Sequence, residues 1–167
     1  MYGRVRVIFF GASLFVFSSY SVAQNTDCII DAAECFQINP LIVKAIIWQE
    51  SKNNQNVINK NKNNTTDVGL MQVNSIHFPS LEALGVNTKL LIENSCANVF
   101  SGVWILNQAI HHYGYTWDGI GYYHSSTVFF HDRYIENIIS IITKQSVILN
   151  KIQVSRLDGI KEKFHCG

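Results

Sequence analysis

The sequence predicts a single, mainly α-helical domain that carries one small polar hairpin or loop region and is cross-linked by disulfides. Apolar residues recur at helical spacing in several segments, and 167 residues are enough for one domain with a hydrophobic core. Half of the fourteen residues 53–66 are asparagine, which is typical of a solvated loop that could hold a short hairpin. The chain has four cysteines, and an even number in an exported protein favours disulfides.

The first 23 residues have the pattern of a secretory signal peptide. Arg4 and Arg6 make the start positive, residues 7–17 form a short apolar run, and Ser21-Val22-Ala23 offers small residues at a cleavage site. A retained membrane anchor is the alternative, but the apolar run is shorter than a helix that crosses a bilayer. We therefore expect an exported mature chain of residues 24–167 that keeps no stable membrane span.

Charge and motif content argue against several classes of function. Without Arg4 and Arg6 the chain has 11 basic and 12 acidic residues, and this balance gives no electrostatic footprint for nucleic acid. His111 and His112 are neighbours on a predicted helix, so their side chains point in different directions and cannot bind one metal ion together. No His-Glu-x-x-His motif occurs. A phosphate-binding loop and a Gly-x-Ser-x-Gly elbow are also missing from the sequence. We expect neither a metal nor a cofactor.

The cysteines Cys28, Cys35, Cys96 and Cys166 all follow the predicted cleavage site, and four cysteines allow three pairings. A zinc site is the alternative, but no Cys-x-x-Cys pair is present. Cys28 and Cys35 fall on one predicted helix, where two turns would separate them by roughly 10 Å, which is too far for a disulfide between them. Each is therefore expected to reach a distant partner.

The predicted helices can be placed from their caps and apolar spacing. Thr26 is expected to cap a helix that runs to about Phe36, and Asn39 is expected to cap a second helix that has Pro40 at its first position. Further helices are predicted over residues 80–84, about 90–93 after a cap at Asn87 or Thr88, 97–113 before Gly114, 117–124, and 133 to about 145 after a cap at Asp132. Residues 147–154 alternate partly like a strand, and residues 146–167 are expected to form a peripheral tail that Cys166 ties down.

Glu50 is the leading candidate for a catalytic acid. Val43, Ile46 and Ile47 precede it by seven, four and three residues, so the four side chains share the apolar face of the second helix. Glu50 also lies in the last turn, where the helix dipole disfavours a negative charge. Both effects raise the pKa of the carboxyl and favour the protonated form that a general acid needs. The alternative is a glutamate at a helix end that faces water.

Three motifs together carry a family resemblance. Glu50-Ser51, Gly69-Leu70-Met71-Gln72 followed by Asn74, and Tyr122-Tyr123-His124 occur in this order. They resemble the soluble Slt-type lytic transglycosylases, which have a goose-lysozyme-like fold. Residues 45–51 and 66–77, and Cys96 before the long helix, are most similar to the small subgroup that accompanies type III and type IV secretion systems, conjugation machinery and type IV pili. The resemblance extends over about residues 28–145.

The resemblance implies a periplasmic peptidoglycan lytic transglycosylase that acts on glycan strands, with components of a secretion, conjugation or pilus machine as partners; we expect a monomer. It implies that Glu50 is the single catalytic acid and base, and that Tyr123 orients Glu50 through its hydroxyl. It pairs Cys28 with Cys96 and leaves Cys35 for Cys166. It places these residues at the substrate cleft: Ser51, Gly69, Leu70, Met71, Gln72, Asn74, Tyr123 and His124. Gln72 and Asn74 would bind the acetamido group, and Met71 either floors the cleft or packs in the core.

Two positions leave alternatives open. The family usually has Tyr-Asn-Ala-Gly where this chain has Tyr123-His124-Ser125-Ser126, so His124 either makes binding pH-dependent or is a surface histidine. Asp67 either faces Glu50 as a second carboxylate, which would permit hydrolysis, or caps a turn through its own backbone. A hydrolytic muramidase that uses Glu50 and Asp67 is therefore one alternative function. A catalytically weak wall-binding assembly protein is the other.

Overall fold

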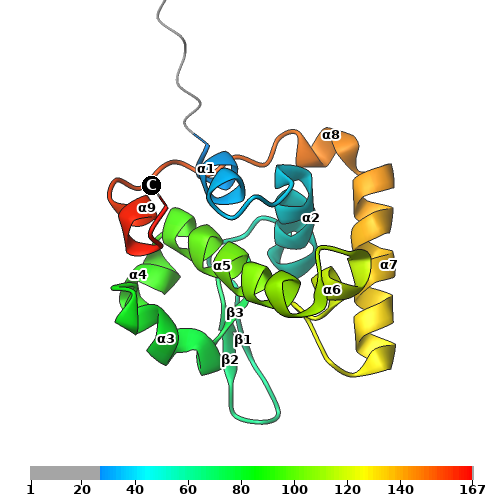
Figure 1. Cartoon of the computed structure of the whole chain (residues 1–167), viewed down its shortest axis with the longest axis horizontal. Helices are drawn as coiled ribbons and strands as arrows, with labels where there is room; N and C mark the ends of the chain where they lie inside the picture. Colours follow the sequence, from blue (N-terminus) through cyan, green and yellow to red (C-terminus); the bar gives the residue numbers. More distant parts are fainter. Residues whose placement is uncertain (1–26, 167) are drawn as a thin grey trace, which may run out of the picture.

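The structure is a computed structural model that describes residues 27–166, so the predicted signal peptide and its cleavage site lie outside it. Helices surround the long helix α5, and a small antiparallel sheet projects from one end of the domain (Figure 1). The predicted mainly α-helical fold with a small polar hairpin is confirmed. The elements in chain order are α1 (Cys28–Cys35), α2 (Pro40–Ser51), β1 (Ile58–Lys60), β2 (Thr66–Val68), β3 (Val73–Asn74), η1 (Ser75–His77), α3 (Phe78–Ala83), α4 (Thr88–Glu93), α5 (Ser95–Tyr113), α6 (Trp117–Gly121), α7 (Val128–Lys144), α8 (Ser146–Leu149) and α9 (Ile160–Lys163).

The helix that carries Glu50 begins as predicted. The side chain of Asn39 accepts a hydrogen bond from the backbone N–H of Leu41 at 2.9 Å, and Pro40 occupies the first position of α2. The helix ends at Ser51, after which Lys52 adopts the left-handed conformation with φ 54°. Glu50 is therefore held in the last turn of a helix with a defined start and end.

The cap of α1 differs from the prediction. Asp27 holds the N-cap position, and its carboxylate accepts from the backbone N–H two residues later at 3.0 Å. Thr26, the predicted cap, lies outside the described residues. Asp27 also accepts from the N–H of Val154 at 3.1 Å, so the start of α1 is tied to the C-terminal part of the chain.

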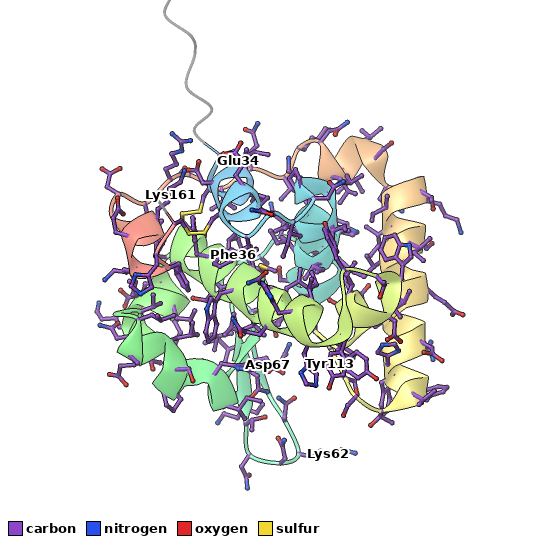
Figure 2. All side chains as sticks on the ribbon, viewed as in Figure 1. Glu34, Phe36, Lys62, Asp67, Tyr113 and Lys161 are labelled. Atoms are coloured by element: carbon purple, nitrogen blue, oxygen red, sulfur yellow. A yellow bond between two sulfur atoms is a disulfide. The ribbon has the colours of Figure 1, made fainter. Side chains whose placement is uncertain are left out.

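The asparagine-rich segment forms the predicted hairpin. β1 pairs antiparallel with β2, with Ile58 opposite Val68 and Lys60 opposite Thr66, and β3 pairs with the other edge of β2. Lys62 lies at the tip of this hairpin and points away from the helices (Figure 2). The strand residues 58–60 are exposed, so the hairpin is held by its backbone pairing and by asparagine side chains rather than by a core of its own.

The helix α5 forms the centre of the core. Its apolar stripe of Val99, Val103 and Leu106 is fully buried, and Gly114 with φ 91° ends the helix, as predicted. Helix α1 packs against α5, α2 packs against α7, and α6 contacts both α5 and α7. This arrangement places the end of α2 between the sheet and the segment after α6.

Two predictions of secondary structure in the C-terminal third were wrong. Helix α7 begins at Val128 rather than at residue 133, because Val128, Phe129 and Phe130 are helical although they are exposed and break the amphipathic pattern. Asp132 is therefore inside the helix and accepts from the ring of His131 instead of capping. Residues 147–154 are not a strand, since Ser146–Leu149 form the short helix α8.

The tail after α7 is part of the core rather than peripheral. The ring of Phe164 stacks on that of Phe100 in α5, with centroids 5.6 Å apart. The Cys35–Cys166 and Cys28–Cys96 disulfides have Cα–Cα distances of 5.4 and 5.7 Å, and these are the pairings that the resemblance implies (Figure 2). The tail contributes these buried side chains: Leu149, Ile152, Val154, Ile160 and Phe164. Over residues 27–166, no helix combines the length and the apolar character needed to cross a bilayer.

Candidate active site

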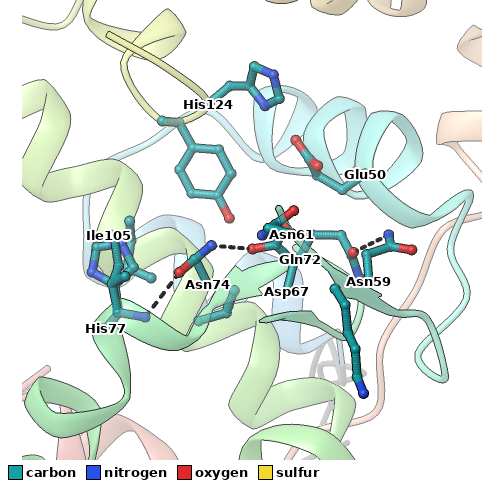
Figure 3. Close-up of a pocket in the computed structure, with 13 residues that line it drawn as sticks. Glu50, Asn59, Asn61, Asp67, Gln72, Asn74, His77, Ile105 and His124 are labelled. Atoms are coloured by element: carbon teal, nitrogen blue, oxygen red, sulfur yellow. Dashed lines mark hydrogen bonds between the residues drawn. The ribbon is translucent and has the colours of Figure 1, made fainter. Parts of the chain in front are cut away.

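A cleft of about 660 Å³ lies where the end of α2 faces the small sheet. Glu50 and His124 approach it from one side, and Asp67, Gln72 and Asn74 approach it from the sheet (Figure 3). Residues far apart in the sequence therefore meet at one place. The lining residues are Glu50, Asn59, Lys60, Asn61, Asp67, Gln72, Val73, Asn74, Ile76, His77, Ile105, Tyr123 and His124.

The carboxyl group of Glu50 is held in a largely apolar environment. Its helical neighbours Val43, Ile46 and Ile47 are fully buried, and its Oε1 atom is buried without a hydrogen-bond partner among the described residues. Burial raises the pKa of Glu50 from 4.5 to about 7, and the nearby charge of Asp67 adds to this increase. A carboxyl group with this pKa is populated in both protonation states near neutral pH, so it can donate a proton and accept one back.

The tyrosine that acts on Glu50 is Tyr134, which sequence reasoning did not find. The Tyr134 hydroxyl favours the ionised carboxyl and so lowers the pKa of Glu50, against the larger effect of burial. In the resting geometry the Tyr134 oxygen, like Glu50 Oε1, is buried without a well-formed hydrogen bond to the described residues. Tyr123 lines the cleft, but its hydroxyl donates to the carbonyl of Met71 at 2.6 Å, so the expected hydrogen bond from Tyr123 to Glu50 is not formed.

Asp67 faces the cleft from β2 and does not cap a turn through its own backbone. Its two carboxylate oxygens accept from the side-chain amides of Asn61 at 2.8 Å and Asn74 at 2.6 Å. These hydrogen bonds fix its orientation, and its charge acts on Glu50 across the cleft. Of the two interpretations that the sequence left open, the geometry favours the second carboxylate.

Gln72 and Asn74 line the cleft, but their amide groups are already engaged. Gln72 donates to the carbonyls of Val57 at 3.1 Å and Gly69 at 2.8 Å, and it accepts from Asn59 at 2.7 Å. Besides its bond to Asp67, Asn74 accepts from the backbone N–H of Ile76 in η1 at 3.0 Å. Both side chains therefore shape the sheet side of the cleft, and their expected role of binding an acetamido group stays a prediction.

Four residues of the predicted cleft lie behind its surface. Ser51 is buried and donates to a carbonyl one turn earlier in α2, and Leu70 and Met71 are almost fully buried. Gly69 has φ 78°, and a Cβ atom there would collide with the side-chain amide of Asn98. That amide accepts from the N–H of Met71 at 2.9 Å, so these residues support the wall of the cleft. Met71 therefore packs in the core, the second of its two expected roles.

His124 is exposed and lines the cleft. Its ring stacks on that of Tyr134, with centroids 4.7 Å apart and planes 4° apart. Burial lowers the pKa of His124, and the charge of Asp67 opposes this effect. A neutral imidazole therefore covers the tyrosine beside Glu50 near neutral pH.

Comparison with known proteins agrees with this geometry. The sequence model of the family described as "Transglycosylase SLT domain" matches residues 27–132, which include every lining residue of the cleft. The chain belongs to this family.

Among curated relatives, the SLT chain is 37% identical over 101 residues to "Invasion protein IagB" of Salmonella typhimurium (strain SL1344), covering 60% of this chain and 63% of the relative. It is 34% identical over 103 residues to "Protein IpgF" of Shigella flexneri, covering 62% and 68%. It is 35% identical over 104 residues to "X polypeptide" of Escherichia coli, covering 62% of each chain. The similarity to IagB thus spans less than two thirds of that relative.

The SLT chain has cleft residues that its motifs did not reveal. Asn59, Lys60 and Asn61 come from the hairpin, where composition alone gave no reason to prefer one asparagine over another. Tyr134 falls on the same helical stripe as Ile138 and Ile141, which are buried, and a buried tyrosine needs a partner for its hydroxyl. That pattern was the available signal for Tyr134. Residues 27–166 hold no cluster of three or more histidine, cysteine, aspartate or glutamate side chains suited to a metal ion.

Proposed function

We propose that this SLT protein is a peptidoglycan lytic transglycosylase that cleaves the β-1,4 bond between N-acetylmuramic acid and N-acetylglucosamine and forms a 1,6-anhydromuramic end. The observation that carries the proposal is the buried carboxyl of Glu50, which faces a cleft of about 660 Å³ with a pKa of about 7. Family membership supports glycan strands as the substrate.

Glu50 supplies both proton transfers. Its protonated carboxyl donates a proton to the glycosidic oxygen, and the bond from that oxygen to the muramoyl anomeric carbon breaks. The resulting carboxylate takes the proton of the muramoyl C6 hydroxyl, whose oxygen bonds to the same anomeric carbon. The nucleophile belongs to the substrate and has a high effective molarity, so the reaction needs no second carboxylate and no positioned water. The net change is one glycosidic bond between sugars exchanged for one internal glycosidic bond from C1 to O6, and Glu50 ends protonated.

The proposed place of action is the periplasm, after removal of residues 1–23. The predicted signal peptide and the nature of the substrate support this location. We further propose that the protein opens the wall locally for a secretion, conjugation or pilus apparatus. The motif resemblance to that subgroup supports this role, as does the similarity to a relative named as an invasion protein.

A hydrolytic muramidase is the second candidate, and the placement of Asp67 favours it. Asp67 shares the cleft with Glu50 and is oriented by Asn61 and Asn74. A second carboxylate in this position could stabilise positive charge on the sugar or activate a water molecule. The two candidates differ in their products, since hydrolysis leaves a reducing end.

The test of the proposal is lysis of purified peptidoglycan by the wild type and by Glu50→Gln, followed as loss of turbidity. Glu50→Gln keeps the shape of the side chain and removes its proton chemistry, so lysis should fall to background. Glu34→Gln, an exposed change on α1, is the matched control and should retain full activity. Undiminished lysis by Glu50→Gln would overturn the proposal. A wild type that binds the wall without lysing it would favour the assembly-protein alternative.

A further inference from the structure

Each of the two ring nitrogens of His131 lies within hydrogen-bonding distance of an acceptor oxygen. His131 is 5% exposed. Its Nδ1 atom lies 2.8 Å from Oδ1 of Asp132, and its Nε2 atom lies 2.9 Å from the backbone carbonyl oxygen of Asp118. A carbonyl oxygen can only accept, and an ionised carboxylate can only accept. A neutral imidazole carries one N–H, so both bonds form together only when the ring is doubly protonated.

The surroundings of His131 are acidic and aromatic. Asp132 on α7 and Asp118 on α6 are the charged groups that face it, and Oδ1 of Asp118 lies 3.5 Å from Nε2. The ring of Tyr122, which follows α6, lies 4.7 Å from the His131 ring and stacks in turn on Tyr113 of α5 at 3.6 Å. Among the described contacts, α5 therefore contributes the ring of Tyr113 behind Tyr122 and no charged group.

His131 joins α7 to α6, the helix that directly precedes the cleft-lining residues Tyr123 and His124. Helix α6 packs against α7 and runs directly into Tyr123 and His124, while Tyr134 follows His131 by three residues on α7 (Figure 1). The close packing leaves no room for adjustment, because a Cβ atom on Gly121 of α6 would collide with the His131 ring. The distance between α6 and α7 is thus set at His131, next to the side chains that surround Glu50.

We propose that His131, in its doubly protonated form, is a positioning residue that clamps α6 to α7 and holds Tyr123, His124 and Tyr134 in place around Glu50. This inference rests on the proposed function for its effect on activity. The protonation of the clamp can be measured without any substrate.

The clamp has a defined dependence on pH. The hydrogen bond to Asp132 is the largest influence that raises the pKa of His131, and the carbonyl and charge of Asp118 add to it, whereas burial opposes it. A histidine with a raised pKa stabilises the fold at low pH and loses this contribution as the pH rises through the raised value. Above that pH either the Asp118 carbonyl or the Asp132 carboxylate loses its donor, so the clamp weakens.

Nuclear magnetic resonance of histidine-labelled protein tests the protonation directly. Across a pH titration, His131 of the wild type should show two protonated ring nitrogens and a midpoint above 6.5, the ordinary value. Asp132→Asn keeps an oxygen acceptor but removes the charge, so it should lower that midpoint. A His131 that is a single neutral tautomer at pH 6 in the folded wild type would overturn the proposal.

Kinetics on soluble glycan strands test the positioning role. His131→Gln can satisfy only one acceptor, so kcat/KM should fall about fivefold below the midpoint of the His131 titration, the effect of losing roughly 1 kcal/mol of hydrogen bonding. Above that midpoint the wild-type ring also satisfies only one acceptor, so the difference should shrink. At a pH between the His131 midpoints measured for the two proteins, Asp132→Asn should be less active than the wild type. It should recover wild-type activity at pH 5.5, where the His131 ring is protonated in both proteins. His111→Gln, an exposed change on α5, is the control. Equal kcat/KM of folded His131→Gln and wild type at pH 5.5, or no acid recovery in Asp132→Asn, would refute the clamp. Absence of cleavage by the wild type would instead refute the proposed function.

Discussion

The imidazole of His124 lies flat against the phenol ring of Tyr134, with planes 4° apart and centroids separated by 4.7 Å. The two residues come from different elements, the segment after α6 and helix α7. Their stack covers the tyrosine whose hydroxyl acts on Glu50. The environment of the proposed catalytic acid is therefore set by a contact between elements as well as by its own helix.

Replacement of Tyr134 by phenylalanine should shift the pH dependence of lysis. The hydroxyl lowers the pKa of Glu50, so its removal should raise that pKa and move the alkaline limb of the activity profile to higher pH. Tyr123→Phe is the matched control, because that hydroxyl is bonded to the Met71 carbonyl and its loss should leave the limb in place. An unmoved limb in Tyr134→Phe would show that the hydroxyl does not act on Glu50.

Glu50→Gln should make the protein more stable at alkaline pH. The pKa of Glu50 is about 7 in the folded state against 4.5 as the ordinary value, so its favourable contribution is complete below pH 4.5 and is lost as the pH rises through 7. A glutamine does not ionise, so it does not lose this contribution. For a pKa difference of this size the loss in the free energy of unfolding is about 3 kcal/mol. Urea unfolding at pH 8 should show the gain, and the difference should vanish at pH 4. Equal stability at both pH values would mean that the carboxyl is solvated.

Asp67→Asn should shift the pH profile of lysis in the opposite direction from Tyr134→Phe. The Asp67 charge raises the pKa of Glu50, so its removal should lower that pKa and move the alkaline limb to lower pH. Lysis at pH 5.5 should persist if Glu50 works alone. Asp158→Asn, an exposed change in the tail, serves as the control. Complete loss of lysis at every pH, in a folded protein, would favour the muramidase.

Gly69→Ala should destabilise the protein more than Gly159→Ala. Both glycines have positive φ, 78° and 76°, and the left-handed conformation alone costs a non-glycine residue about 1–2 kcal/mol. A Cβ atom on Gly69 would also collide with Asn98, whereas one on Gly159 meets nothing within 4 Å. Chemical unfolding of both variants measures the difference. Equal losses would show that the Asn98 amide moves aside freely.

Sequence patterns predicted the local features of the fold and the position of Glu50. The start of α2 at Asn39 and Pro40, the end of α5 at Gly114 and the asparagine-rich hairpin all depend on near neighbours in the chain. The start of α7 was missed because exposed Val128, Phe129 and Phe130 carry no amphipathic signal. The buried tail was missed because Phe164 packs on Phe100, a contact between residues that are far apart in the sequence.

The sequence predicted the catalytic acid of the candidate site but not the residues that position it. The apolar spacing around Glu50 correctly indicated a raised pKa. Motif positions could not distinguish residues that face the cleft from those behind it, so Ser51 and Leu70 were placed at its surface although both are buried. The hydroxyl that lowers the pKa of Glu50 belongs to Tyr134, whereas the Tyr123 hydroxyl donates to the carbonyl of Met71. These hydroxyl directions depend on how α6 and α7 pack.

Mass spectrometry of the muropeptides released from purified peptidoglycan tests the central claim most directly. If Glu50 acts as acid and then base on the substrate's own C6 hydroxyl, the products of the wild type carry 1,6-anhydromuramic ends and are one water lighter than hydrolysis products. Glu50→Gln should release neither kind. Products with reducing ends alone would contradict the account and assign the cleft to hydrolysis.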